Sequence, residues 1–206
     1  MIDDTFRKVL PRLSLPLVNL LIRLKVTPNQ LTVSAALIAL LAAAALAQGH
    51  LLVALGLWWF SRLWDGLDGI LARATDSTSD FGALLDIQLD MMAYSAMVVG
   101  FYLQFPQYAL QWVLMLFGYV LCITGALSLG NLENLRGIDA REQRDLRLAT
   151  GLAEGGETGM FYTLFLLLPN WLGVTTWIWL GVLAVTVIAR LELARRELSY
   201  QEQNEK

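Results

Sequence analysis

The chain has 206 residues, of which 56% are hydrophobic and only 16% are charged, and its net charge is −3. An average soluble domain carries roughly 25% charged residues, so this composition excludes a disordered chain and argues against an ordinary soluble enzyme. Long apolar runs instead indicate a membrane protein, and the acidic balance gives no basic field for nucleic acid. The single cysteine, Cys122, excludes an intramolecular disulfide and a cysteine-based metal site.

The first residues alternate between apolar and basic side chains and include Pro11 and Pro16. They lack the clean apolar core of a cleavable signal peptide. We expect residues 1–26 to form an amphipathic helix on the membrane surface, broken near Pro16.

Six later segments are long and apolar enough to span a bilayer, which requires about 20 mostly apolar residues. They cover residues 31–48, 51–73, 82–104, 107–131, 152–169 and 172–193. The predicted fold class is therefore all-α: an integral membrane protein whose six transmembrane helices lie within residues 27–193, followed by a cytoplasmic tail over 194–206. With six spans, all 15 Lys and Arg residues fall on the side that holds both termini. The positive-inside rule places that side in the cytoplasm, and we expect the membrane to be a bacterial inner membrane.

Four aspartates lie where apolar residues are expected. Asp65 and Asp68 are three residues apart near the end of the second span, and Asp86 and Asp90 are four apart at the start of the third. Each acid near hydrocarbon depth costs about 2.5–3.5 kcal/mol on an insertion scale. Each pair projects from one helix face, and consecutive antiparallel helices can turn the two faces together. Four converging carboxylates need bound cations, and hard oxygen ligands select Mg²⁺, Mn²⁺ or Ca²⁺; four acids suit two such ions.

The alternative interpretation treats the acids as helix-end groups, which suits Asp76 and Asp80 but not the four together. Small residues lie among those four. Gly69 and Ala72 keep one helix face slim, and Arg73 can bind a phosphate with two hydrogen bonds. The sequence therefore predicts a metal and a phosphate ligand at the cytoplasmic membrane surface.

The same stretch resembles the signature of the CDP-alcohol phosphotransferase family, D-x-x-D-G-x-x-A-R, eight residues, then G-x-x-x-D-x-x-x-D. Every specified position is matched: Asp65, Asp68, Gly69, Ala72, Arg73, Gly82, Asp86 and Asp90. The run Thr27 to Thr32 resembles a second family motif that precedes the first span. The resemblance covers nearly the whole chain and is strongest to a bacterial branch of the family.

The resemblance implies a homodimer of six-helix subunits that transfers a substituted phosphate from a CDP-linked donor to an alcohol and releases CMP. It implies Mg²⁺ or Mn²⁺, two ions in all, held by Asp65, Asp68 and Asp86. Asp90 would be a ligand, the general base, or both. The donor site would comprise Asn29, Gln30, Asp65, Gly69, Ala72, Arg73, Ser79 and Gly82.

The donor expected is CDP-diacylglycerol, because a site open at the bilayer surface lets the lipid tails stay in lipid. The mirror alternative is a soluble CDP-aminoalcohol that donates to diacylglycerol. For the acceptor the sequence offers two hints. Arg136 and Arg190 suit a phosphorylated alcohol, whereas Glu154 and Glu157, beside several glycines, suit an unphosphorylated one. The two glutamates also fit the ordinary preference for acids in a first helical turn. We favour the unphosphorylated alcohol.

The competing function classes are a small membrane transporter and an inactive scaffold. Intramembrane acids are common in ion pathways. Here the acids cluster at one membrane face in a nucleotide-type motif, which argues against a transporter. A scaffold is disfavoured because no signature acid is missing.

Overall fold

The computed structural model describes residues 15–135 and 155–204, so predictions for Arg136 and Glu154 lie outside the described residues. Over those two ranges the structure is helical throughout its regular elements, without a strand. The all-α fold class is therefore confirmed. The chain divides into two compact units, one formed by residues 1–112 and 166–169 and the other by residues 113–165 and 170–206.

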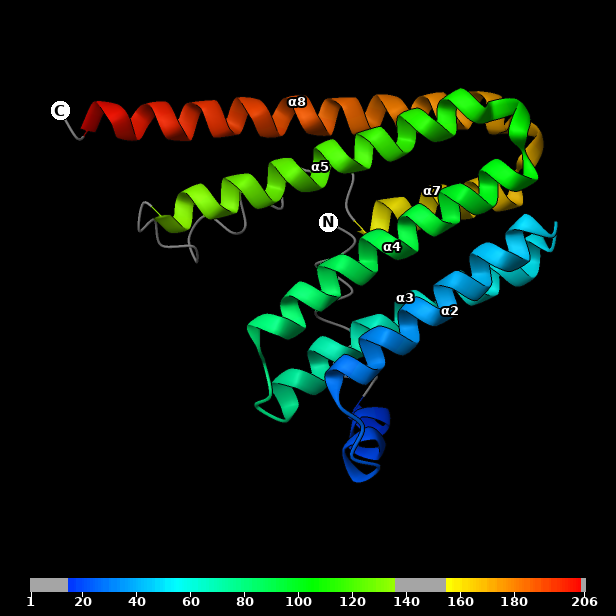
Figure 1. Ribbon diagram of the computed structural model, residues 1–206, viewed down its shortest axis with the longest axis horizontal. Helices are drawn as coiled ribbons and strands as arrows, with labels where there is room; N and C mark the ends of the chain where they lie inside the picture. The colour runs from blue at the N-terminus through cyan, green and yellow to red at the C-terminus, as the bar shows by residue number, and fades with distance from the viewer. Residues whose placement is uncertain (1–14, 136–154, 205–206) are drawn as a thin grey trace. The chain divides into compact units, whose positions relative to one another are not determined.

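The first unit is built on a helical segment at residues 15–23 and three long helices (Figure 1). These are α2 (Pro28–Ala47), α3 (Leu51–Ala74) and α4 (Asp80–Gln104), followed by a 3₁₀ turn, η1 (Pro106–Tyr108). Helix α2 packs against both α3 and α4. Its approach to α4 is close at Gly100, where an added Cβ would lie 2.8 Å from the carbonyl oxygen of Ala43. A residue without a side chain is therefore required at this crossing.

Two helix starts in this unit are capped by side chains. Thr27 and Gln30 form a capping box at α2: the Gln30 N–H donates to Thr27 Oγ1 at 3.3 Å, and the Thr27 N–H donates to Gln30 Oε1 at 2.9 Å. At α4, the Gly82 N–H donates to Ser79 Oγ at 3.0 Å. These caps determine where the two helices begin.

The helical segment 15–23 rests on the first two long helices. Val18 and Leu21 are buried in one apolar cluster with Leu31 of α2 and with Leu67 and Leu71 of α3. The remaining leucines of this segment, Leu15, Leu17 and Leu20, are exposed. Residues 15–23 of the segment 1–26 are thus helical with one buried side, and the amphipathic surface helix over 1–26 stays a prediction. Its contact with a membrane remains a prediction, and the break near Pro16 concerns residues that are mostly outside the described ranges.

The second unit contains most of α5 (Ala109–Leu135), α7 (Gly155–Leu167), a 3₁₀ turn η2 (Pro169–Trp171) and α8 (Leu172–Asn204). Its core is aromatic. The Phe161 and Trp179 rings lie 4.4 Å apart, and Trp179 Nε1 donates to the Tyr119 hydroxyl at 3.0 Å. The Leu183 side chain packs closely against Gly118: a Cβ added to Gly118 would lie 3.0 Å from Leu183 Cδ1. Close helix packing of this kind is typical of membrane bundles.

Four of the six predicted spans are helices long and apolar enough to cross a bilayer. They are Pro28–Ala47, Asp80–Gln104, Pro106–Leu132 and Pro169–Arg195. Helix α3 is 24 residues long but carries Arg62, Asp65, Asp68 and Arg73, and α7 has only 13 residues. The charges of α3 exclude it from this set of apolar helices. The described part of α7, which begins at Gly155 directly after residues outside the described ranges, is too short to be included, so the count of six remains a prediction.

Candidate functional site

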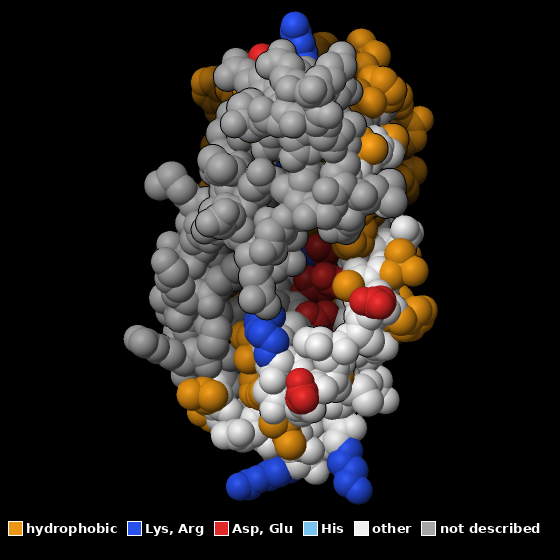
Figure 2. Space-filling model, turned by 90° about the vertical axis from the view of Figure 1, so that its left-hand side faces the viewer, with side chains coloured by type: hydrophobic (Ala, Val, Ile, Leu, Met, Phe, Trp, Pro, Cys, Tyr) orange, Lys and Arg blue, Asp and Glu red, His pale blue; other side chains and the backbone are white. Residues whose placement is uncertain are grey.

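Three aspartates from two helices converge in the first unit. One carboxylate oxygen each from Asp65 and Asp68 of α3 and Asp86 of α4 lies within 4.8 Å of the others. All three side chains are partly buried. Figure 2 shows acidic side chains set back below the surrounding surface. Oxygen ligands in this number, without His or Cys, suit Mg²⁺ or Mn²⁺, so the donor set fits the divalent cation that the sequence predicts.

The fourth aspartate, Asp90, is paired with an arginine. Arg62 Nη1 donates to Asp90 Oδ1, and the same nitrogen lies 3.8 Å from Asp65 Oδ2. Asp90 follows Asp86 by one turn of α4 and does not join the three-acid group. In the sequence, Arg62 is one of 15 positively charged residues and belongs to none of the motifs. Its position three residues before Asp65, on the same helix face, was the available signal.

A threonine from the neighbouring helix supports one of the three acids. Thr32 of α2 is only 3% exposed, and its hydroxyl donates to Asp68 Oδ2. Trp64 Nε1 also donates to Ser34 Oγ at 2.9 Å, which ties α3 to α2 beside the site. Partners of this kind orient metal-ligand candidates. Thr32 closes the run that resembles the second family motif, but it was not singled out as a site residue.

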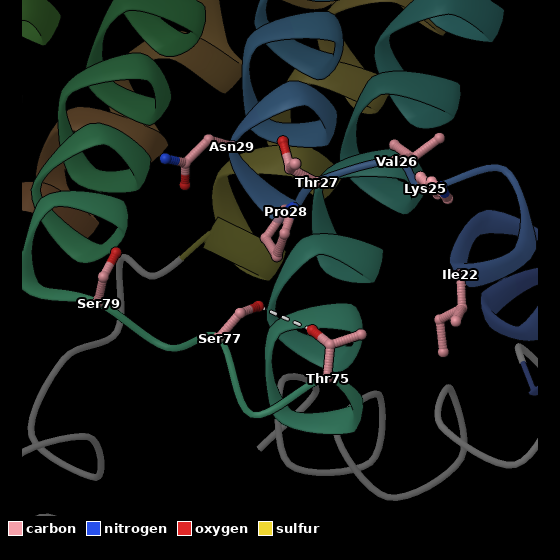
Figure 3. A pocket seen from close by; sticks show the side chains of 9 residues that line it. All are labelled: Ile22, Lys25, Val26, Thr27, Pro28, Asn29, Thr75, Ser77 and Ser79. Carbon is pink, nitrogen blue, oxygen red and sulfur yellow. Dashed lines mark hydrogen bonds between the residues drawn. The ribbon is translucent and has the colours of Figure 1, made fainter.

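A pocket of about 350 Å³ lies where α2 begins and α3 ends. It is lined by Ile22, Lys25, Val26, Thr27, Pro28, Asn29, Thr75, Ser77 and Ser79 (Figure 3). Its polar wall includes the Thr75 and Ser77 hydroxyls, which are 2.7 Å apart. Two of the residues predicted to bind the donor, Asn29 and Ser79, therefore share one pocket.

Gly82 lies against both of these residues. A Cβ at Gly82 would be 3.1 Å from Ser79 Oγ and 3.2 Å from Asn29 Oδ1. The start of α4 thus meets the start of α2 across a glycine. Asp86 follows Gly82 by one helical turn, so the pocket wall and the carboxylate group are joined by one turn of α4.

The other residues predicted to bind the donor differ in their surroundings and contacts. Arg73 folds back along α3, with Nη1 3.3 Å from the place of a Gly69 Cβ. Ala72 is half-buried beside them. The Gln30 side chain is engaged in the α2 capping box, which gives it a structural role at the helix start.

Two acceptor candidates fall in the second unit. Arg190 Nη1 donates to the Cys122 carbonyl oxygen at 2.9 Å, which links α8 to α5. Glu157 lies in the first turn of α7, and its Oε2 is buried without a hydrogen-bond partner within the described ranges. An unpaired buried carboxylate oxygen is costly and thereby favours a ligand with donor groups.

The family described as CDP-alcohol phosphatidyltransferase matches residues 25–189. Because that match covers most of the sequence, the chain belongs to this family of enzymes. The matched region includes the three-acid carboxylate group, the pocket at the start of α2 and the apolar helices. The protein is an integral membrane protein.

Curated relatives support the assignment. The inner membrane protein YnjF of Escherichia coli is 34% identical over 169 residues, which cover 81% of this chain and 82% of the relative. The phosphatidylinositol phosphate synthase of Corynebacterium glutamicum is 41% identical over 83 residues, 40% of this chain and 38% of that protein. The archaetidylinositol phosphate synthase of Pyrococcus horikoshii is 35% identical over 96 residues, 45% of this chain and 51% of that protein.

Solved structures show the same fold. The phosphatidylinositol phosphate synthase of Mycobacterium tuberculosis with CDP-DAG bound aligns with a TM-score of 0.67 and 22% identity, covering 89% of this chain and 94% of that one. The same enzyme in complex with manganese and citrate aligns with a TM-score of 0.65 and 21% identity, covering 87% of each chain.

Proposed function

We propose that this enzyme transfers a phosphatidyl group from CDP-diacylglycerol to a small alcohol and releases CMP. The observation that carries the proposal is the convergence of Asp65, Asp68 and Asp86 within 4.8 Å, one helical turn from the pocket at Asn29 and Ser79. The CDP-DAG bound to the mycobacterial structure and the phosphatidylinositol phosphate synthases among the relatives support this donor.

The three converging carboxylates would hold the divalent cation. A bound Mg²⁺ or Mn²⁺ supplies charge neutralisation at the pyrophosphate and at the departing CMP. Manganese in the mycobacterial structure supports this part of the proposal. The number of cations, two by the sequence analysis, remains a prediction.

The remaining side chains bind and orient the donor. Asn29 and Ser79 contact the nucleotide in their shared pocket, and Arg73 binds phosphate oxygens. Gly69 and Gly82 let the ligand approach the helix backbones.

Asp90 is the base in this proposal. It takes the proton of the acceptor hydroxyl, whose oxygen forms a bond to the β-phosphorus while the bond from that phosphorus to the CMP oxygen breaks. Positioning and charge account for most of the acceleration in transfers of this kind.

The membrane arrangement completes the proposal. All six predicted helices span a bacterial inner membrane, and both termini and the site face the cytoplasm. The distribution of Lys and Arg residues supports this orientation. The name of the Escherichia coli relative supports the membrane. A site at the cytoplasmic surface leaves the diacylglycerol tails in lipid.

For the acceptor we propose an unphosphorylated alcohol. The buried Oε2 of Glu157 supports a ligand that donates hydrogen bonds, such as a hydroxyl or an amine. A phosphate at this carboxylate would meet like charge.

The test is CMP release by the purified full-length protein in detergent, with CDP-diacylglycerol, Mg²⁺ and a panel of acceptors. The panel contains glycerol, inositol, serine, ethanolamine and choline, with glycerol 3-phosphate and inositol phosphate as phosphorylated counterparts. We expect CMP with one unphosphorylated acceptor and none after EDTA, with recovery on adding Mg²⁺ or Mn²⁺.

Other outcomes would correct the proposal in defined ways. Turnover with a phosphorylated acceptor would refute the proposed acceptor class and keep the donor. Turnover only with a CDP-aminoalcohol and diacylglycerol would reverse the direction of transfer. Activity that persists without divalent cations would contradict the metal site.

A further inference from the structure

The turn between the helical segment 15–23 and α2 holds a lysine in an unfavourable backbone conformation. Lys25 has φ 56°, in the left-handed region that residues with a side chain rarely adopt. The Lys25 N–H donates to the Ile22 carbonyl oxygen at 3.0 Å. The Val26 N–H donates to the Leu21 carbonyl oxygen, also at 3.0 Å. These two bonds define a Schellman motif, in which the left-handed residue is usually glycine.

The side chain of Lys25 does not compensate for this strain by packing or pairing. It is exposed, and its ammonium group has no partner within residues 15–135 and 155–204. The apolar contact that accompanies such motifs is made by Val26, which packs against the cluster that contains Leu21. A glycine at position 25 would keep both hydrogen bonds and this contact, and it would relieve the strain. The lysine therefore costs stability at a place where only its side chain distinguishes it from the better residue.

That side chain lines the pocket at the start of α2. Ile22 and Lys25 come to this pocket from the end of the segment 15–23, and Ser77 and Ser79 from the turn between α3 and α4 (Figure 3). Among the nine described residues that line the pocket, Lys25 alone carries a charge. Its ammonium group offers three donors and no acceptor. The lining thus suits a ligand that combines negative charge with several acceptor oxygens, as a phosphate does.

We propose that Lys25 binds a phosphate oxygen of the donor nucleotide and sets the affinity of the pocket for that donor. The identity of the donor rests on the proposed function. The converging aspartates of α3 and α4 would hold a cation, whereas Lys25 adds a positive charge from the turn that precedes α2. The left-handed turn places this charge in the lining of the pocket, next to Val26 and Thr27.

Two effects of opposite sign follow from replacing Lys25 by glycine. The fold becomes more stable, because glycine adopts φ 56° without strain. Donor binding becomes weaker, because the charge in the pocket is lost. A residue that merely connected two helices would show the first effect without the second.

The test compares K25G, K25Q and K25R with the wild-type protein in full length and in detergent. Binding of CDP and of cytidine in the presence of Mg²⁺ is measured by calorimetry, and stability by the midpoint of thermal unfolding. For K25G we expect CDP binding about 3–10-fold weaker and a midpoint about 2–4 °C higher. K25Q keeps the strain and removes the charge, so it should lose the same affinity without the higher midpoint. K25R keeps the charge and should bind CDP within about twofold of the wild type.

Two further readouts separate phosphate binding from a general disturbance of the pocket. Cytidine lacks a phosphate, so its affinity is expected to be the same in all four proteins. In CMP release, the KM for CDP-diacylglycerol should rise in K25Q by the factor seen for CDP, while kcat stays within about twofold.

The matched control is R23Q. Arg23 lies two residues before Lys25, is exposed and does not line the pocket. Its replacement removes a nearby positive charge, and we expect wild-type CDP affinity. Equal losses in R23Q and K25Q would mean that the surface potential as a whole attracts the nucleotide, and they would overturn the proposal.

Other outcomes also decide the matter. Wild-type CDP affinity in K25Q would overturn the proposal, and so would an equal loss for cytidine, which would assign Lys25 to the base or the ribose. If Lys25 instead binds the phosphate of a membrane lipid, added phosphatidylglycerol would raise the unfolding midpoint of the wild type but not of K25Q, and CDP affinity would be the same in both. If the wild type binds CDP but releases no CMP with any acceptor, the proposed function fails, and the CDP titration still decides whether Lys25 binds phosphate.

Discussion

The two units of the molecule both place threonine and serine side chains inside apolar helices, but the acceptors of these hydroxyls differ. In the second unit, most threonine hydroxyls donate to a carbonyl four residues earlier in the same helix, as Thr176 does to Leu172 and Thr186 to Val182. In the first unit, Thr32 also reaches Asp68 on another helix, and Ser61 reaches Ala35. Polar composition alone therefore does not indicate a site, whereas a polar contact between helices at carboxylates does.

The charged residues follow the same division. In the first unit Arg62 pairs with Asp65 on α3 and Asp90 on α4, and Asp65 also converges with Asp68 and Asp86. In the second unit the guanidinium of Arg190 donates to a backbone carbonyl, that of Cys122. The first arrangement forms the proposed ligand site, and the second links α8 to α5.

The largest expected effect comes from a converging acid. Asp68→Asn should lower activity by more than the roughly 10–100-fold that is typical of outer-shell changes, because it removes one of three anionic oxygens from the cation. CMP release and Mn²⁺ binding measure the two consequences. The control is Asp76→Asn: Asp76 is exposed with φ 50°, which asparagine tolerates. Wild-type Mn²⁺ affinity in Asp68→Asn would remove this residue from the metal-binding group.

The next prediction compares two buried threonine hydroxyls, one in each unit. Thr32→Val should lower activity about 10–100-fold, because Asp68 loses the donor that orients it. Thr176→Val is the matched change in the second unit, where an equally buried hydroxyl bonds only within its own helix. We expect that variant to keep its activity. Equal losses in the two variants would break the distinction between the units.

A glycine pair separates packing from chemistry. Gly100→Ala should destabilise the protein by about 1–3 kcal/mol, because the new methyl group meets the Ala43 carbonyl at 2.8 Å. Gly125→Ala adds the same group where nothing lies within 4 Å, and alanine is the better helix former. Thermal unfolding in detergent should therefore show a lower midpoint only for Gly100→Ala. Similar midpoints would mean that α2 and α4 tolerate a wider separation.

The smallest expected effect concerns the acceptor. Glu157→Gln should raise the KM for the acceptor a few-fold and leave the KM for the donor unchanged, since a neutral amide accepts hydrogen bonds less strongly than a carboxylate. Glu192→Gln is the control, because Glu192 is 45% exposed. A Glu157→Gln enzyme with wild-type acceptor KM would return Glu157 to the role of an ordinary first-turn acid.

Much of the fold could be predicted from the lengths of the apolar runs in the sequence. The predicted span 82–104 is α4 (Asp80–Gln104) to within two residues, and 51–73 is α3 (Leu51–Ala74) to within one. Run length could not decide whether α3 spans a membrane, because its charges belong to the site. For the predicted span 152–169, the helix α7 (Gly155–Leu167) covers the described part, and residues 152–154 lie outside the described ranges.

The site was predictable where spacing determines direction. The three- and four-residue separations of the aspartates place them on helix faces, and the structure brings Asp65, Asp68 and Asp86 together. The pairing of Arg62 with Asp90 was not predictable in this way, because a long side chain can reach several neighbours and its choice depends on the Trp58 and Tyr94 rings. Thr32 escaped notice because most helical threonines bond within their own helix.

The two capped helix starts have an electrostatic consequence. Thr27 and Ser79, the first caps of α2 and α4, both line the same pocket. The macrodipole of a helix places roughly half a positive charge at its amino end, so two such ends present a fixed positive potential to one small volume. Because this potential comes from the backbone, it does not depend on the conformations of Lys or Arg side chains. This backbone potential favours an anionic ligand, such as a diphosphate, in the pocket.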